Sequence, residues 1–88
     1  MLRIERASNG KVVYTLIGRI EADDISELHR VFALEGSRVH IVLNLSELLL
    51  ADRAAVEFLA GCEAKGMTLH DCPGYIRKWI DQGKNKNG

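Results

Sequence analysis

Apolar and polar residues alternate along the N-terminal part of the chain. The stretches 2–5 and 12–17 are mainly of this kind, and they lie on either side of Asn9-Gly10. An Asn-Gly pair between alternating stretches is the strongest short-range signal for a β-hairpin. The pattern therefore predicts two antiparallel strands at the N-terminus, with the second strand ending at Gly18.

The pattern changes to helical spacing after the second predicted strand. Asp23 and Asp24 suit the free N–H groups of a helix start, and Glu27 completes a capping-box pattern with Asp24. Gly36 is a suitable C-terminal stop. The apolar residues between these signals fall on one stripe: Ile25, Leu28 and Phe32. We expect an amphipathic helix here.

In the rest of the chain, the predicted elements follow in the order strand, helix, strand, helix. Residues 39–45 form a nearly continuous apolar run, which is typical of a strand covered on both faces. A helix is predicted from about Asp52 to Lys65, a short strand over residues 67–70, and a last helix from Pro73 to Gly83, with its inner face formed by Ile76 and Ile80.

This order of elements predicts an α/β fold. One hairpin followed by βαβ units requires a four-stranded mixed sheet with three helices and parallel strands joined by right-handed crossovers. Binding sites in such sheets lie beyond the carboxyl ends of the parallel strands. The expected loops at that edge are residues 18–24, 46–53 and 71–74.

Composition adds limits to this interpretation. The chain has 88 residues, 47% of them apolar, which suits one domain over residues 1–83 with a flexible tail over residues 84–88. The formal net charge is zero, so no overall field favours nucleic acid or a membrane surface. The polar start and the lack of a long apolar run predict a cytoplasmic protein, with Cys62 and Cys72 reduced.

A family resemblance emerges from residues 41–59. An apolar strand leads to Asn44-Leu45-Ser46, a few apolar residues follow, and Asp52-Arg53-Ala54-Ala55 opens a helix. This arrangement resembles the STAS family, the domain of anti-sigma-factor antagonists and sulfate-transporter tails, in its small stand-alone bacterial type. The resemblance extends to residues 16–21, similar to the family's Gly-x-Leu-Asp turn, and to residues 66–72.

The departures from the family pattern concern its regulation. In the switchable members, a kinase that is also the anti-sigma factor phosphorylates the first Ser of Asp-Ser-Ser-Gly. Arg53 stands at that position, and Asn44 replaces the Asp that ends the family's strand. The switch works by adding negative charge at a partner-facing surface. The resemblance therefore implies a domain that is not switched by phosphorylation at the usual serine.

The predicted helix over residues 52–65 has an unusual outer face. Its inner face is formed by Ala55, Phe58, Leu59 and Cys62, and its outer face and margins by Arg53, Val56, Glu57, Ala60, Gly61 and Ala64. A solvated face normally carries more Lys, Glu or Gln, so these small side chains predict a surface for a protein partner. The adjoining Gly18, Glu21 and Asp23 are expected to contribute. Alternatively, Ala is present only because it is a good helix former.

Two charged residues at the start of this helix keep two roles open. Asp52 is predicted to cap the helix, and it also lies where a partner could contact it. Arg53 places a cation at the positive end of the helix dipole, which helix stability does not favour. It is compatible with a contact to an anionic group of a partner or ligand, and also with a solvated pair with Glu57.

We therefore predict a non-catalytic regulatory domain without a cofactor. The resemblance implies a partner such as an anti-sigma-type histidine-kinase-like ATPase or another STAS protein. The alternative is a sensor that binds an anion or nucleotide at the N-terminus of the second helix. A metal or thiol enzyme is disfavoured because paired ligand spacing is absent among His29, His40, His70, Cys62 and Cys72. Trp79 is expected to pack at a helix flank.

Overall fold

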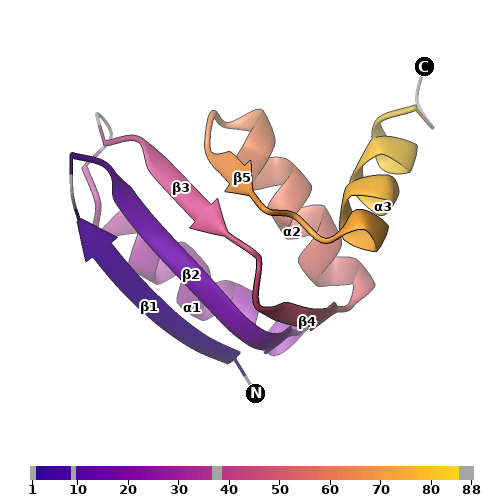
Figure 1. The fold of residues 1–88 in the computed structure, drawn as a ribbon, viewed down its shortest axis with the longest axis horizontal. Helices are drawn as coiled ribbons and strands as arrows, with labels where there is room; N and C mark the ends of the chain where they lie inside the picture. The colour runs from indigo at the N-terminus through magenta and orange to yellow at the C-terminus, as the bar shows by residue number, and fades with distance from the viewer. Residues whose placement is uncertain (1, 9, 37–38, 86–88) are drawn as a thin grey trace.

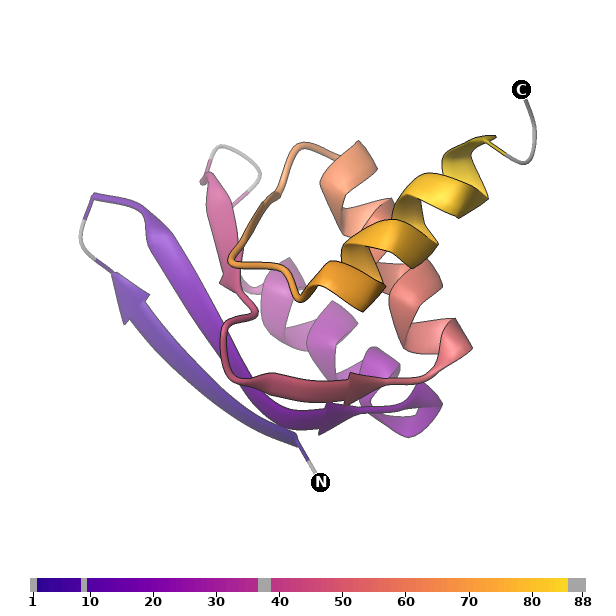
Figure 2. The same cartoon turned by 45° about the vertical axis from the view of Figure 1, so that its right-hand side comes forward.

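The computed structural model describes residues 2–8, 10–36 and 39–85, and its fold is the predicted α/β arrangement (Figures 1 and 2). The strands are β1 (Leu2–Ser8), β2 (Val12–Ile20), β3 (Ile41–Asn44), β4 (Leu48–Ala51) and β5 (Thr68–His70). The helices are α1 (Ala22–Ala33), α2 (Arg53–Ala64) and α3 (Gly74–Asn85). The sheet order is β1-β2-β3-β5, with β4 also paired to β2.

The N-terminal hairpin is confirmed. β1 and β2 pair antiparallel, with Ser8 opposite Val12 and Leu2 opposite Gly18. Gly10 has φ 78°, a left-handed conformation that glycine adopts without steric cost, whereas Asn9 lies outside the described residues. The second strand does not end at Gly18 as predicted, because β2 continues to Ile20.

The fifth strand, β4, lies in a segment that was expected to be a loop. β2 has nine residues and β3 only four, so β3 pairs with the first half of β2 and β4 pairs in parallel with its end. β3 and β4 therefore share one edge of β2, and the sheet keeps four strand positions. The register shifts between Gly18 and Arg19, and β4 buries its first and last residues, so it lacks the period of two that reveals a strand in a sequence.

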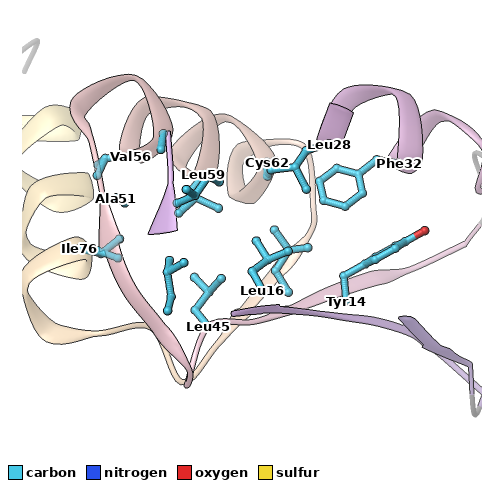
Figure 3. Close-up of a cluster of buried hydrophobic side chains, with 14 of the residues drawn as sticks. Tyr14, Leu16, Leu28, Phe32, Leu45, Ala51, Val56, Leu59, Cys62 and Ile76 are labelled. Carbon is cyan, nitrogen blue, oxygen red and sulfur yellow. The ribbon is translucent and has the colours of Figure 1, made fainter. Parts of the chain in front are cut away.

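The core lies between one face of the sheet and the helices. Side chains of β2 and β3 on this face are buried, whereas those on the opposite face, including Val13 and Val42, are only half-buried. Figure 3 shows α1 and α2 above the buried face, with Leu28, Leu59 and Cys62 turned toward the strands. On α3, Ile76 and Ile80 are buried as predicted. The helices thus cover one side of the sheet.

Three helix ends differ from the predictions. Glu21 precedes α1 and exchanges hydrogen bonds with Asp24, so the capping pair lies three residues before the predicted Asp24 and Glu27. The chain leaves α1 at Leu34, before Gly36. Helix α3 continues through Gly83 to Asn85, because a glycine lowers helix stability without forcing a stop. Residues 86–88 of the expected tail lie outside the described residues.

An ionic cluster holds the edge strand β1 to the end of α1. Arg6 donates to both carboxylate oxygens of Glu35, from Nε at 2.8 Å and from Nη2 at 3.1 Å. The Tyr14 hydroxyl donates to the same carboxylate. Hydrogen bonds from Arg6 and then from Tyr14 hold the pKa of Glu35 below its ordinary value. The charged form of Glu35 therefore stabilises the folded state.

The burial pattern predicts different effects for neighbouring strands. Leu43 on β3 is fully buried, and Leu49 on β4 is 73% exposed. Replacing Leu43 with Ala should lower the free energy of unfolding by about 2–5 kcal/mol, since it removes methyl groups from a packed core. Leu49→Ala should change it by less than about 0.5 kcal/mol. Urea unfolding followed by circular dichroism tests this, and equal effects would contradict the described sheet.

The Glu35 cluster predicts a pH dependence with a definite sign. A lowered carboxyl pKa contributes stability that is present above the ordinary value of 4.5 and is lost as pH falls through the folded-state value. Glu35→Gln should therefore be less stable than the original chain at neutral pH, and this difference should shrink below pH 4.5. Urea titrations across this range would measure it, and a constant difference would show that the charge is unimportant.

Candidate functional site

Asp52 joins the beginnings of two helices. Its Oδ1 accepts a hydrogen bond from the Ala55 N–H at 2.9 Å, which is the predicted N-cap of α2. Its Oδ2 accepts from the Ala22 N–H at 3.0 Å, at the start of α1. Its own N–H donates to the Ile20 carbonyl at 3.3 Å. One residue therefore fixes the point where β2 and β4 end and α1 and α2 begin.

Arg53 and Glu57 lie on the surface directly after this junction. Arg53 Nε is 3.5 Å from Glu57 Oε2, and the two side chains are 81% and 70% exposed. The solvated pair with Glu57 is thus the arrangement that the free chain adopts. An ion pair in water contributes little to stability, so Arg53 and Glu57 can separate and each pair with a charge of a partner.

Most of the predicted outer face of α2 is at the surface. We call Arg53, Glu57, Ala60, Gly61 and Ala64 the α2 ridge. Arg53, Glu57 and Ala64 are exposed, and Ala60 and Gly61 are half-buried. A Cβ atom added to Gly61 would meet no heavy atom within 4 Å outside its own helix. Helix α2 lies between α1 and α3 (Figure 2), so this strip of mostly small side chains is bordered by a helix on each side.

Two residues of α2 have exchanged the environments that helical spacing predicts. Val56 is only 5% exposed and belongs to the core, so it is not part of the partner surface. Phe58 is half-buried and stacks near His29 and Phe32, at ring-centre distances of 4.9 and 6.2 Å. The reason is that α2 packs against α3 as well as against the sheet, which turns its buried face toward Val56.

The other predicted contact residues lie near Asp52. Gly18 is a half-buried strand residue with φ 99°, and its N–H donates to the Glu47 carbonyl at 3.2 Å. Its role is therefore backbone geometry. Glu21 and Asp23 are exposed at the beginning of α1. Since Asp52 links this turn to α2, the structure brings Glu21 and Asp23 to the same end of the molecule as Arg53.

Exposed apolar residues on β4 and α3 were missed by the sequence analysis. Leu49 and Leu50 are 73% and 53% exposed, and Tyr75 and Trp79 are 43% and 47% exposed. The Tyr75 hydroxyl donates to the Leu49 carbonyl at 3.0 Å, which connects the two elements. The expectation that Trp79 packs is wrong, because Ile76 already fills the buried side. The spacing of four residues between Tyr75 and Trp79 was the signal for a second stripe.

Cys62 and Cys72 are both free cysteines, the first buried and the second half-buried. Burial raises the pKa of Cys62 to about 11 and also raises that of Cys72, so both thiols are protonated at neutral pH and are weak nucleophiles. Among the described residues, no group of three or more His, Cys, Asp or Glu is placed to hold a metal ion. Within the same part of the chain, no helix is long and apolar enough to cross a membrane.

Comparisons with known proteins identify the fold. No protein-family model matches the sequence, and no curated protein matches it. The anti-sigma-factor antagonist SpoIIAA in its unphosphorylated form has a similar structure, with a TM-score of 0.56, 14% identity and coverage of 96% of this chain and 98% of that one. A STAS-domain anti-sigma-factor antagonist from Rhodobacter sphaeroides has a TM-score of 0.56 and 14% identity, and the match covers 84% of this chain and 91% of that one.

A third similar structure is only partly comparable in length. Mglu has a TM-score of 0.62 and 18% identity; the match covers 82% of this chain and only 19% of that protein. The two antagonist structures establish the STAS-like fold that the sequence resemblance implied.

The two hydrogen bonds of Asp52 predict a graded loss of stability. Asp52→Ala should lower the free energy of unfolding by about 2 kcal/mol, because each lost helix cap contributes about 1 kcal/mol. Asp52→Asn retains one acceptor oxygen, so its free energy of unfolding should lie between that of the original chain and that of Asp52→Ala. Asp23→Ala is the matched control, since it removes an exposed carboxylate from the same region, and we expect less than about 1 kcal/mol. Thermal or urea unfolding would decide, and equal effects of Asp52→Ala and Asp23→Ala would contradict the double cap.

Proposed function

We propose that this chain is a non-catalytic regulatory domain that binds a protein partner through the α2 ridge. The observation that carries the proposal is the surface position of this strip. Ala60, Gly61 and Ala64 are small enough for a flat contact, and the strip begins with one ion pair. Glu21 and Asp23 add carboxylates at the same end. Such a surface suits a partner that lies flat against α2 and supplies complementary charges to Arg53 and Glu57.

The rigid base of the ridge supports this role. Both carboxylate oxygens of Asp52 are occupied by N–H groups of α1 and α2, so we assign Asp52 to positioning and not to partner contact. The ridge begins immediately afterwards. On the other side of α2, Arg77 of α3 donates to both carboxylate oxygens of Glu63 at 3.1 and 2.7 Å. These contacts hold α2 in place, which lowers the ordering cost of binding.

In our proposal, Arg53 makes partner binding depend on concentration and not on phosphorylation. The position has no hydroxyl group for a phosphate, and its guanidinium is permanently charged. In our proposal, the partner is bound or free according to concentration, and phosphorylation at this position plays no part. The STAS-like fold and the sequence pattern support a cytoplasmic partner such as an anti-sigma-type histidine-kinase-like ATPase or another STAS protein.

The position of Asp52 favours this proposal over an anion sensor. A free helix N-terminus attracts phosphate because its N–H groups are unpaired and its dipole is positive. Here a carboxylate already occupies the starts of both α1 and α2. An added anion would meet this negative charge, and the nearby Glu21 and Asp23 would add to the repulsion. A protein surface with mixed charges meets no such obstacle.

Variants at Gly61 test the ridge with a matched pair. Gly61→Ala keeps the strip smooth and should raise helix stability by about 1 kcal/mol, because alanine restricts the unfolded chain. Gly61→Lys places a long charged side chain on the same spot without disturbing the core. In quantitative capture from a native lysate, we expect Gly61→Ala to retain the partner. We expect Gly61→Lys to weaken the affinity for the partner at least about tenfold, which corresponds to about 1.4 kcal/mol or more of binding free energy.

The result is interpreted against folding and ligand controls. Circular dichroism should show both Gly61 variants folded. Equal capture by the two variants would show that the ridge is not the binding surface. Micromolar binding of ATP or sulfate in isothermal titration, abolished by Arg53→Ala, would replace the proposal with the anion sensor.

A further inference from the structure

The outer edge of β1 is a second surface, far from the α2 ridge. β1 pairs with β2 along all seven of its residues and forms the end of the described sheet order, so its other edge has no strand beside it. Figure 1 shows β1 at the side of the sheet opposite to β5 and α3. The strand contains no proline. An edge of this kind presents backbone N–H and C=O groups that can pair with another strand.

Two charges on β1 make this edge complementary to itself. Arg3 and Glu5 lie two residues apart on the sheet face that the helices leave uncovered, with Arg3 Nη2 at 3.0 Å from Glu5 Oε2 and side-chain exposures of 74% and 51%. When two β1 strands pair antiparallel about Ile4, Arg3 of each copy lies opposite Glu5 of the other. Oppositely charged cross-strand pairs stabilise a sheet, and this arrangement creates two of them.

The charges also select the register. Antiparallel hydrogen bonding requires the two-fold axis to pass through a residue pair, because alternate residues point their backbone groups to alternate edges. An axis at Arg3 would oppose Arg3 to its own copy, and an axis at Glu5 would oppose Glu5 to its own copy. Both arrangements place like charges face to face. The register centred on Ile4 avoids this and pairs unlike charges.

The helix side of β1 agrees with the same register. A hollow of about 360 Å³ lies between β1 and α1 and is lined by Leu2, Ile4, Asp24 and Glu27. With the axis at Ile4, Leu2 lies opposite Arg6 of the second copy, whose guanidinium stays paired with Glu35 of its own chain. The half-buried Ile4 would lie directly opposite Ile4 of the other copy. Both faces of the strand therefore fit a second copy.

We propose that a second copy of this chain binds along β1, forming a two-fold symmetric dimer with one continuous sheet. The dimer leaves the α2 ridge accessible, so it would present two partner-binding surfaces. This inference does not depend on the proposed function. A short edge contact of this kind forms reversibly, and since its charges are exposed it weakens as salt concentration rises.

Charge exchange at two positions tests the proposal. Arg3→Glu creates facing glutamates in the dimer, and Glu5→Arg creates facing arginines. Sedimentation equilibrium at low salt should show a dimer for the original chain and a dissociation constant raised at least about tenfold for each single variant. The double variant Arg3→Glu/Glu5→Arg restores both pairs and should restore the dimer. An equimolar mixture of the two single variants should form a heterodimer, because every facing pair is again complementary.

The controls separate this contact from others. Lys78→Glu makes the same charge change on exposed α3 and should leave the dimer unchanged. The proposal is overturned if the original chain remains a monomer at the highest concentration reached, or if the single variants dimerise as well as it does. It is also overturned if neither the double variant nor the mixture recovers the dimer. Partner capture by Gly61→Ala with Arg3→Glu should stay unchanged, so failure here is distinguishable from failure of the α2 ridge.

Discussion

The carboxylate of Asp52 is the interaction on which the arrangement of this domain depends. Its two oxygens accept hydrogen bonds from the first turns of α1 and α2, whose starting residues are about thirty positions apart in the chain. The same residue follows β4 and bonds to the end of β2. Two strand ends and two helix starts are therefore held by one side chain, which determines where the α2 ridge begins.

Ion pairs in this structure divide into those that hold the fold and those that remain available. Glu35 with Arg6, and Glu63 with Arg77, are two-point contacts between separate elements, with Glu35 mostly buried and Glu63 partly so. The pair formed by Arg53 and Glu57 connects neighbouring turns of one helix and is largely in water. Bidentate pairs between elements resist exchange, and exposed single contacts do not. Charge at the proposed surface is therefore free to rearrange.

The candidate site was predictable to the extent that it depends on helical spacing. Arg53, Glu57 and Ala64 are exposed as the pattern required, and the cap at Asp52 follows from its position before the helix. Val56 was assigned to the wrong side, because spacing gives the angle between residues and not the number of elements that cover a helix. Trp79 was misplaced for the same reason, since the interior beneath α3 is filled by isoleucine.

The sequence alone determined the hairpin, the order of every element except β4, the α/β class and the residues that alternate toward the core. These depend on local backbone preferences and on hydrophobic periods that a short window contains. Tertiary structure decided the existence of β4, which forms because the end of β2 offers an unpaired edge. It also decided the second hydrogen bond of Asp52 and the burial of Val56. Each of these depends on a contact between elements that are distant in the sequence, and a local sequence pattern does not specify such contacts.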